Sequence, residues 1–415
     1  MDDQEVGERP WVFGRAPKVA GGRSVALIET EVRVRALLPS IPVTRVADLT
    51  PLDIIGLPVF SACTPLATDL AVHLGKGTDA RGAWLSAVME AIERVSAEEV
   101  DEASTVHATF DALQTASGDA VALDPESFCL PPESTYRPDR NLPWVGGHDL
   151  IQDQPVWLAR DLAVNPPRDG LLANIDTNGL ASGNTHLEAV VHGICEVIER
   201  DAFSQVDFCA MFADSHDRTM PVRTVDPATL PPLAASVVER LRAAGQHVVV
   251  QDITSDLGVA TFAAYVLEPS YPTSAGTAPM LFLGLGAHPD SGVAVVRALV
   301  EANQARLARI QGARDSYNTA PAHLRTTTLL DVLRRLAPAP VVSFEEVPSS
   351  PSDDLLDDLE LLLGRLRSRG LERCVVVDLT RRDLDIPVVR VRVPGLSSFF
   401  VDARRVDRRC WRWLL

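Results

Sequence analysis

Positive charge is scarce in this sequence. Its 415 residues carry 39 Lys and Arg against 56 Asp and Glu, which gives a formal net charge of −17 and a pI near 5.0. Proteins that bind DNA or RNA rely on Lys and Arg patches that meet the phosphates. The charge balance therefore excludes nucleic acid as the main partner. It does not exclude a nucleotide, because a few local cations and a bound metal ion can reverse the local field.

Long apolar runs and paired cysteines are also missing. No stretch approaches the roughly 20 apolar residues that span a bilayer, and residues 1–10 lack the apolar core of a secretory signal. The absence of a CxxC motif disfavours a zinc site and a disulfide framework. We therefore expect a cytoplasmic protein without a membrane partner. The six scattered cysteines are Cys63, Cys129, Cys195, Cys209, Cys374 and Cys410.

The proportions of residue types are otherwise those of a globular protein, with 46% hydrophobic and 23% charged residues. The length is sufficient for a large core or two domains. Apolar stretches of strand length alternate with long amphipathic segments, which predicts a mixed α/β (α+β) fold. We divide the chain into an N-terminal flanking segment at 1–55, a main domain at 56–400 and a C-terminal tail at 401–415.

The expected elements follow from periodicity and from breakers. Residues 122–147 are rich in proline and glycine and are expected to form a loop. In the flanking segment, only short apolar stretches broken by prolines are visible. Helices are expected over 84–100, 187–208, 293–310, 329–336 and 354–369. Strands are expected over 56–63, 156–159, 248–253, 259–267, 281–285, 374–379 and 387–393.

Two of these helices carry carboxylates on one stripe. On the first, Ser86, Glu90, Glu93 and Arg94 fall within roughly 100° of arc, opposite an apolar side that begins at Leu85. The second repeats the Glu-x-x-Glu-Arg pattern in a sector of roughly 120°. This repetition is compatible with an ancient duplication and with convergence. The second stripe comprises Glu188, His192, Glu196, Glu199 and Arg200.

Carboxylates one turn apart are suited to magnesium. Mg²⁺ takes carboxylate oxygens and keeps waters and phosphate oxygens in its remaining positions. Two such helices that face each other would build a multi-metal triphosphate site, in which each arginine steadies a carboxylate or contacts a phosphate. The alternative is a solvated helix face with weak ion pairs, and for one helix alone that is the more common outcome.

Glycine-rich segments precede both helices. Lys76 stands between two glycines and could reach a phosphate, with Thr78 as the N-cap, although the segment is not a Walker A loop. Before the second helix, Gly179 and Gly183 permit tight turns or a close ligand approach, and Asn184 can donate and accept hydrogen bonds. Simple turns would explain both segments equally well.

Two further features have ordinary alternatives. Thr185 and Glu188 match a capping box, so Glu188 could serve only to cap the helix. On the third helix the polar candidates are Arg297, Glu301, Gln304 and Arg309, of which the last two lie about 140° apart and would flank a groove. Taken alone, that helix is more typical of a charged surface.

The three segments together resemble the YcaO family, and the resemblance runs from about residue 55 to 400. The first fits S-x-x-x-E-x-x-E-R with Ser86, Glu90, Glu93 and Arg94. The second fits the long motif of the family with Asp176, Gly179, Ala181, Gly183, Ala189, Glu196, Glu199 and Arg200. The third fits Q-x4-R with Gln304 and Arg309.

The resemblance implies a YcaO-like fold and an enzyme that binds ATP and Mg²⁺ without a Walker motif. In such enzymes a nucleophile adds to a peptide backbone carbonyl, the oxyanion takes the γ-phosphoryl group of ATP, and phosphate then leaves. A cysteine or serine side chain gives an azoline, an amine gives an amidine, and external sulfide gives a thioamide. The enzyme would be a cyclodehydratase or a thioamide-forming ligase that modifies a ribosomally made peptide.

The resemblance also assigns residues. Metal and phosphates would be held by Glu90, Glu93, Glu196 and Glu199. The nucleotide site would be completed by Lys76, Ser86, Arg94, Asn184, Glu188, Arg200, Gln304 and Arg309. His192 lies on the second stripe, where it would act as a general base or, more ordinarily, pack or form hydrogen bonds.

The tail departs from part of the family. It ends in Cys410–Leu415 without the Pro-x-Pro-x-Pro pattern of many azoline-forming members. The chain is more similar to standalone or TfuA-associated members. The partners that follow are a precursor peptide and a TfuA-like or other accessory protein, and a homodimer is compatible with the sequence.

Two other functions stay open at this point. A non-catalytic family member would bind a peptide or a partner enzyme as a scaffold, because fold alone does not fix function. A metal-dependent hydrolase would activate water without ATP, and the specific motif match disfavours it.

Overall fold

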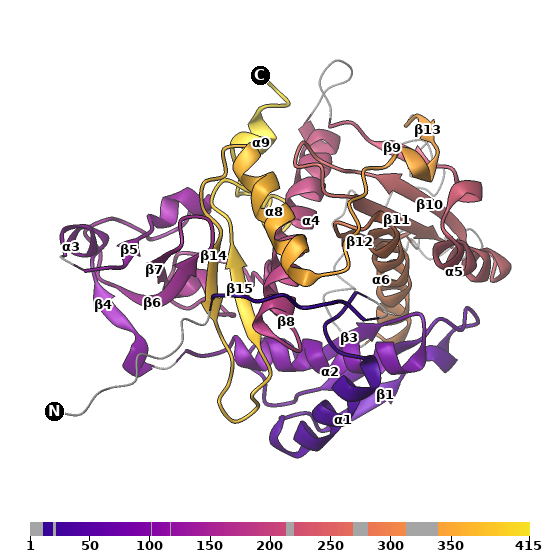
Figure 1. Cartoon of the computed structure of the whole chain (residues 1–415), viewed down its shortest axis with the longest axis horizontal. Helices are drawn as coiled ribbons and strands as arrows, with labels where there is room; N and C mark the ends of the chain where they lie inside the picture. Colours follow the sequence, from indigo (N-terminus) through magenta and orange to yellow (C-terminus); the bar gives the residue numbers. More distant parts are fainter. Residues whose placement is uncertain are drawn as a thin grey trace.

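Three β-sheets and several long helices build the part of the chain that the computed structural model describes (Figure 1). That part comprises residues 11–19, 22–100, 102–116, 118–212, 220–268, 281–312 and 339–415. The expected mixed α/β architecture is confirmed. The helix expected over 329–336 lies outside the described residues. Across the described ranges, no helix is both long and apolar enough to cross a membrane.

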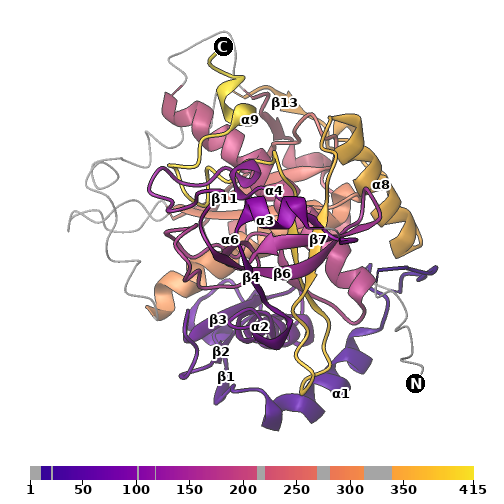
Figure 2. The same ribbon diagram turned by 90° about the vertical axis from the view of Figure 1, so that its left-hand side faces the viewer.

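The first sheet has the order β1-β2-β3 and is antiparallel throughout. Its strands are β1 (Arg45–Asp48), β2 (Val59–Cys63) and β3 (Val72–Lys76). Helix α2 (Ala80–Ser96) packs on β2 and β3, and α1 (Leu27–Leu37) packs on α2. Figure 2 shows this layer below strands β4, β6 and β7. The short apolar stretches expected in the flanking segment thus belong largely to one helix.

Helix α2 begins earlier than expected, and its cap differs from the predicted one. The Asp79 side chain accepts a hydrogen bond from the Gly82 amide at 2.9 Å, so Asp79 is the N-cap and the prediction of Thr78 was wrong. An N-cap carboxylate also suits the positive end of the helix dipole.

The second sheet has seven strands, in the order β5-β7-β6-β14-β15-β8 with β4 beside β6. Its strands are β4 (Val106–Ala108), β5 (Val121–Ala122), β6 (Leu142–Asp149), β7 (Gln154–Ala159), β8 (Leu180–Ser182), β14 (Val375–Asp378) and β15 (Val388–Arg392). Helix α3 (Phe110–Thr115) lies near β5. The loop expected over 122–147 is wrong at its end, because Pro143, Gly146 and Gly147 hide the pattern of β6.

The third sheet has the order β12-β11-β10-β9-β13. Its strands are β9 (Arg223–Val225), β10 (His247–Asp252), β11 (Thr261–Leu267), β12 (Leu281–Ala287) and β13 (Val341–Val342). The expected pair β10 and β11 is antiparallel, with His247 opposite Leu267. Helices α5 (Pro232–Ala243) and α6 (Ser291–Gln311) pack here, with α6 against β11 and β12.

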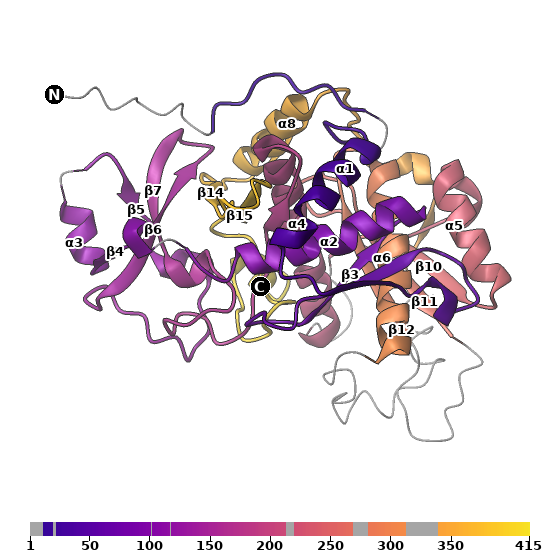
Figure 3. The ribbon, with the colours of Figure 1, turned by 90° about the horizontal axis from the view of Figure 1, so that it is seen from below.

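Helix α4 (His186–Phe212) joins the second and third sheets. It contacts β8 and β15 of the second sheet and β11 and β12 of the third. It also contacts α8 (Leu355–Ser368) and α9 (Arg408–Trp411). Figure 3 shows α2, α4 and α6 near the middle of the molecule, and the charges of Glu93 on α2 and Glu196 on α4, and of Glu199 on α4 and Glu301 on α6, act on each other. The three helices with the predicted site residues are therefore neighbours.

Strand β3 and helix α2 approach each other so closely that a side chain cannot fit between them. A Cβ added at Gly75 would lie 2.0 Å from the backbone nitrogen of Ala87 and 2.3 Å from the carbonyl oxygen of Ala83. Both neighbours are backbone atoms and cannot rotate away. The glycine before Lys76 is thus required by packing.

We expect Gly75→Ala to lower the free energy of unfolding by about 2 kcal/mol or more, because β3 must move off α2. Gly364→Ala is the matched control: Gly364 is exposed within α8 and its added Cβ meets nothing. That change should raise the free energy of unfolding by about 0.5–1 kcal/mol. Urea titrations of both variants provide the measurement. Equal stability of the two variants would contradict the close approach.

Candidate nucleotide and metal site

The polar stripe of α2 faces protein, not solvent. Glu93 is buried and its Oε1 accepts hydrogen bonds from Ser182 N at 2.8 Å and Ser182 Oγ at 2.6 Å. Arg94 donates to Glu90 at 3.0 Å and to Asp69 at 2.7 Å. Ser86 is half-buried and has no hydrogen-bond partner among the described residues. A solvated helix face is therefore excluded for α2.

The stripe of α4 is similar. The Glu196 and Glu199 side chains are 20% and 11% exposed. Arg200 Nε lies 3.9 Å from Glu196 Oε1, and Arg200 Nη2 lies 3.7 Å from Glu199 Oε1. Its guanidinium also sits 5.7 Å from the ring centre of Phe400. These two distances are longer than hydrogen bonds. Arg200 therefore offsets part of the negative charge of both carboxylates and leaves their oxygens available to a ligand.

Glu188 does more than cap α4. Its amide donates to Thr185 Oγ1 at 3.2 Å, which is half of the expected capping box. Its carboxylate instead accepts hydrogen bonds from Arg23 at 2.7 Å and from the Ser24 hydroxyl at 2.7 Å, and Asn184 Nδ2 lies 3.1 Å away. Arg23 and Ser24 were not predicted, because no local pattern in the flanking segment points to a residue so distant in sequence.

Helix α6 brings a further carboxylate to the same place. Glu301 forms an ion pair with Lys76, and the charge of Arg200 acts on it as well. Burial lowers the pKa of Lys76, but Glu301 more than offsets this, so the ammonium stays charged. Glu301 is a polar candidate of this helix in the sequence, but the family resemblance assigned it no role, although its spacing from Gln304 places both on one side of the helix.

Two other α6 residues lack partners at this place. Arg297 is half-buried with no hydrogen-bond partner in the described ranges, and burial lowers its pKa. Gln304 Oε1 is buried and has no hydrogen-bond partner in the part of the chain that the structure describes. Arg309 lies in the last turn of α6, about 12 Å along the axis from Glu301. The structure therefore places Gln304 with the other polar groups and Arg309 at a distance from Glu301.

The carboxylates crowd one another. Burial and the charge of Glu90 raise the pKa of Glu93 to about 8. Burial also raises the pKa of Glu196 and of Glu199 to about 7, and neighbouring carboxylates add to the effect. Burial acts in the same sense on Glu90, but Arg94 prevails and holds its pKa below the ordinary value. Entry of positive charge would relieve this repulsion.

The donor set fits magnesium with a nucleotide. Within the described residues, no three His, Cys, Asp or Glu side chains come close enough to hold a metal ion by themselves. Mg²⁺ uses one or two carboxylates and takes its other ligands from phosphates and water. Pairs of glutamates beside arginines that keep free hydrogen-bond donors are suited to that arrangement. They are not suited to a metal site in which every ligand comes from the protein.

The first half of the long motif has a structural role. Asp176 is buried and accepts hydrogen bonds from Arg392 at 3.0 Å and Arg405 at 2.8 Å, which hold its pKa well below the usual range despite burial. Gly179 has φ +74°, and an added Cβ would lie 2.1 Å from the Val391 carbonyl oxygen. These residues fix β15 and the tail against the segment that precedes α4.

The tail is anchored directly behind the glutamates. Arg409 donates to the two carboxylate oxygens of Asp201 at 2.6 and 2.8 Å, and the Asp201 side chain is fully buried. Arg409 and Arg412 both bind Asp256 as well. Since Asp201 directly follows Arg200, the tail holds the turn of α4 that carries the site.

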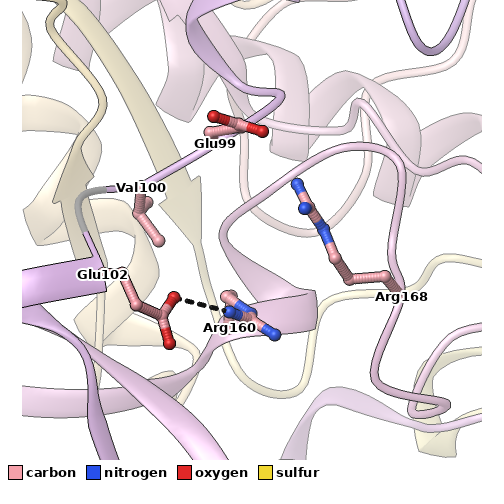
Figure 4. A pocket seen from close by; sticks show the side chains of 5 residues that line it. All are labelled: Glu99, Val100, Glu102, Arg160 and Arg168. Atoms are coloured by element: carbon pink, nitrogen blue, oxygen red, sulfur yellow. Dashed lines mark hydrogen bonds and ion pairs between the residues drawn. The ribbon is translucent and has the colours of Figure 1, made fainter.

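A separate cavity of about 430 Å³ lies beyond the end of α2 (Figure 4). Arg160 already pairs with Glu102 at 3.1 Å and with Asp169 at 2.7 Å. The predicted site residues do not line this cavity. Its lining residues are Glu99, Val100, Glu102, Arg160 and Arg168.

Comparison with known proteins decides the family. Residues 74–397 match the family described as YcaO cyclodehydratase, ATP- and Mg²⁺-binding. The chain belongs to the YcaO family. The cofactors expected from the sequence, ATP and Mg²⁺, are confirmed.

YcaO relatives cover nearly the whole chain. An uncharacterized protein of Methanothermobacter thermautotrophicus is 38% identical over 90% of this chain and 94% of its own length. An uncharacterized protein in the tfuA 3′ region of Rhizobium leguminosarum bv. trifolii is 34% identical over 90% of this chain and 88% of its own. The YcaO domain therefore extends over most of both relatives.

Solved structures confirm the YcaO-like fold. YcaO from Methanopyrus kandleri, bound with AMPPCP and Mg²⁺, is 25% identical with a TM-score of 0.75 and covers 95% of this chain and 98% of its own. A heterocyclase in complex with substrate and cofactor is 24% identical with a TM-score of 0.79 and covers 94% of this chain. This chain spans only 55% of that heterocyclase, so the likeness concerns the fold alone.

The raised carboxylate pKa values predict a pH dependence. Glu196 and Glu199 titrate near 7 when folded and near 4.5 when unfolded, so the folded protein binds more protons in between. Without metal, their contribution to the free energy of unfolding should fall as pH rises from about 4.5 to 7. Thermal unfolding in EDTA should show a flatter pH profile for Glu196→Gln/Glu199→Gln than for wild type. Parallel profiles would contradict the predicted crowding.

The tail anchor predicts a stability effect. Arg409→Met leaves the buried Asp201 charge unpaired and should lower the free energy of unfolding by about 3 kcal/mol. Arg408→Met, at the exposed neighbouring position, should change it by less than about 0.5 kcal/mol. Urea unfolding of both variants tests this. Two equally small changes would show that the tail does not hold α4.

Proposed function

We propose that this chain uses ATP to phosphorylate the oxygen of a backbone amide in a ribosomally made peptide. The observation that carries the proposal is the meeting of carboxylates and cations from α2, α4 and α6 beside Lys76. YcaO family membership supports it. A structural neighbour, YcaO from Methanopyrus kandleri bound with AMPPCP and Mg²⁺, supports the use of ATP.

In this proposal the glutamates bind the metal ion and the cationic side chains stabilise the phosphates. Glu90, Glu93, Glu196 and Glu199 hold Mg²⁺, which neutralises charge on the phosphates when bound. Phosphoryl transfer needs mainly positioning and charge stabilisation from the protein. Arg200 and Arg297 would stabilise the charge that develops on the transferred group, and Arg297 has no hydrogen-bond partner among the described residues. The other predicted nucleotide contacts come from Lys76, Ser86, Arg94, Asn184, Glu188, Gln304 and Arg309.

His192 is the group proposed to accept the proton of the nucleophile. It lies one turn before Glu196 on α4, and burial with the charge of Arg297 lowers its pKa well below the ordinary value. The imidazole is therefore neutral at pH 7 and able to take a proton. A role in packing is the alternative for this side chain.

The fate of the activated amide sets the product. Closure by a side chain gives an azoline, an amine gives a macroamidine, and sulfide gives a thioamide. The relative in a tfuA 3′ region supports a TfuA-like partner for this chain as well as the precursor peptide. We place the reaction in the cytoplasm, in keeping with the unpaired cysteines.

The test is peptide-dependent release of phosphate from ATP with a change in peptide mass. Loss of water identifies azoline or amidine closure, and exchange of oxygen for sulfur identifies a thioamide.

Glu196→Gln and Glu199→Gln should abolish ATP turnover and leave the circular dichroism spectrum unchanged, because the carboxylates hold the metal. Glu360→Gln, on the exposed side of α8, is the control and should retain activity. ATP turnover retained by the site variants would remove these residues from the site, and ATP binding without turnover on any peptide would favour a scaffold.

A further inference from the structure

The sequence similarity between the two glutamate-bearing helices, α2 and α4, extends to α6. Residues 74–94, 180–200 and 285–305 align without a gap. Each begins with leucine, and each carries glutamate at the same place, as Glu90, Glu196 and Glu301. Two other places hold only small residues. These are Ala83, Ala189 and Ala294 at one place and Ala87, Gly193 and Ala298 at the other.

The secondary structure repeats in the same register. Each segment contains a strand end, a short turn and a helix, and the helices begin at the equivalent residues Ala80, His186 and Ser291. The residue before each helix caps it. Asp79 accepts from Gly82 N at 2.9 Å, Thr185 from Glu188 N at 3.2 Å, and Asp290 from Gly292 N at 2.7 Å.

We call the segments 74–94, 180–200 and 285–305 the first, second and third unit. The backbone packing between the strand and the helix of each unit also repeats. A Cβ on Gly75 would lie 2.3 Å from the Ala83 carbonyl oxygen, and one on the equivalent Gly286 would lie 2.2 Å from that of Ala294. Gly77 and Gly183 form a second equivalent pair. A Cβ on Gly77 would lie 2.6 Å from the Ala83 nitrogen, and one on Gly183 would lie 2.6 Å from the equivalent Ala189 nitrogen. Agreement of close contacts at matched positions is not expected from chance similarity of helices.

The units close into a ring. Helix α2 contacts β8 of the second unit, α4 contacts β12 of the third, and α6 contacts β3 of the first (Figure 1). Two side-chain contacts follow the same order of units: Ser182 at the end of β8 donates to Glu93 of the preceding unit, and the equivalent Lys76 at the end of β3 pairs with Glu301 of the third. The two glutamates stand one turn apart in the alignment, because Glu301 is the equivalent of Glu90 and not of Glu93. The carboxylates therefore face a common centre between three equivalent units.

Counter-ions break the threefold pattern. In the first two units the glutamate has an arginine four residues later, with Arg94 3.0 Å from Glu90 and Arg200 3.9 Å from Glu196. In the third unit that place holds Ala305, so Glu301 lacks the arginine that follows the glutamate in the other two units. The cation comes from Lys76, one of two lysines in the chain. The charges of Glu199 and Glu90 act on the same ammonium.

We infer that the site is a ring of three homologous strand–helix units, that Glu301 faces magnesium as the equivalent of Glu90 and Glu196, and that Lys76 is the resident cation which magnesium nucleotide displaces from Glu301. The freed ammonium then turns to a phosphate. The inference rests on the magnesium and nucleotide part of the proposed function but not on the peptide reaction, so the two can fail separately.

Binding of Mn²⁺ without nucleotide tests the inference, followed by calorimetry or by electron paramagnetic resonance of the free ion. Lys76→Met removes the competing charge and should tighten nucleotide-free Mn²⁺ binding by about tenfold or more. Lys76→Arg should stay near wild type. In the double variant Lys76→Met/Glu301→Gln, the gain should disappear, because the exposed carboxylate is gone.

Arg81→Met is the matched control, because it removes one positive charge from the exposed first turn of α2. It should leave Mn²⁺ affinity unchanged. Equal affinity of Lys76→Met and wild type would overturn the inference, as would an equal gain in the control or a gain that persists in the double variant. If Lys76→Met does not fold, Lys76→Gln removes the same charge with a polar side chain, and thermal unfolding identifies the usable variant.

Discussion

Like charges held together in a half-buried space are the constraint on which the rest of the structure depends. Burial raises the pKa of Glu93, Glu196 and Glu199 and makes their ionisation costly in the absence of a metal. Hydrogen bonds and cations from other elements partly compensate this cost. The Ser182 amide on β8 donates to Glu93, Lys76 on β3 pairs with Glu301, and Arg409 in the tail pairs with Asp201 of α4. A site that is poorly balanced when empty gains most from a ligand that brings positive charge, so the crowding that weakens the fold also favours magnesium binding.

Helical periodicity was sufficient to predict the stripes. The apolar side of α2, with Leu85, Val88 and Ile92, is buried as the projection requires, and the glutamates share the other side. Long elements carry enough repeats for such a signal to exceed local noise. Short elements do not: β6 is interrupted by a proline and two glycines, and the cap of α2 depended on a choice between adjacent residues with similar capping ability. The family resemblance supplied the cofactors, which no spacing argument could have ranked above an ordinary charged face.

Contacts between distant residues lay beyond the sequence. Lys76 and Glu301 are 225 positions apart, and Ser24 and Glu188 are 164 apart. Such pairs follow from how the sheets meet around α4, and neither partner has a local pattern that reports it. Asp176 is a different case: its Oδ2 accepts from Arg392 and Arg405 and its Oδ1 accepts from the Asn178 amide, so this carboxylate of the motif is a structural anchor. A motif therefore marks a constrained position without saying whether chemistry or packing constrains it.

The absence of a Walker loop has a physical counterpart in the three units. Phosphate-binding loops present free amides at a helix N-terminus. Here the first turns of α2 and α6 are capped by Asp79 and Asp290, whose carboxylates take those amides and would repel a phosphate. Thr185 takes the amide of Glu188 in the remaining unit. Under the proposed function, negative phosphate charge would therefore be met by Lys76 and along the helix sides, where glutamates need a metal ion between them and the phosphates. Acidic side chains at the centre and acidic caps at the ends are thus parts of one arrangement, in which magnesium replaces the backbone amides of a phosphate loop.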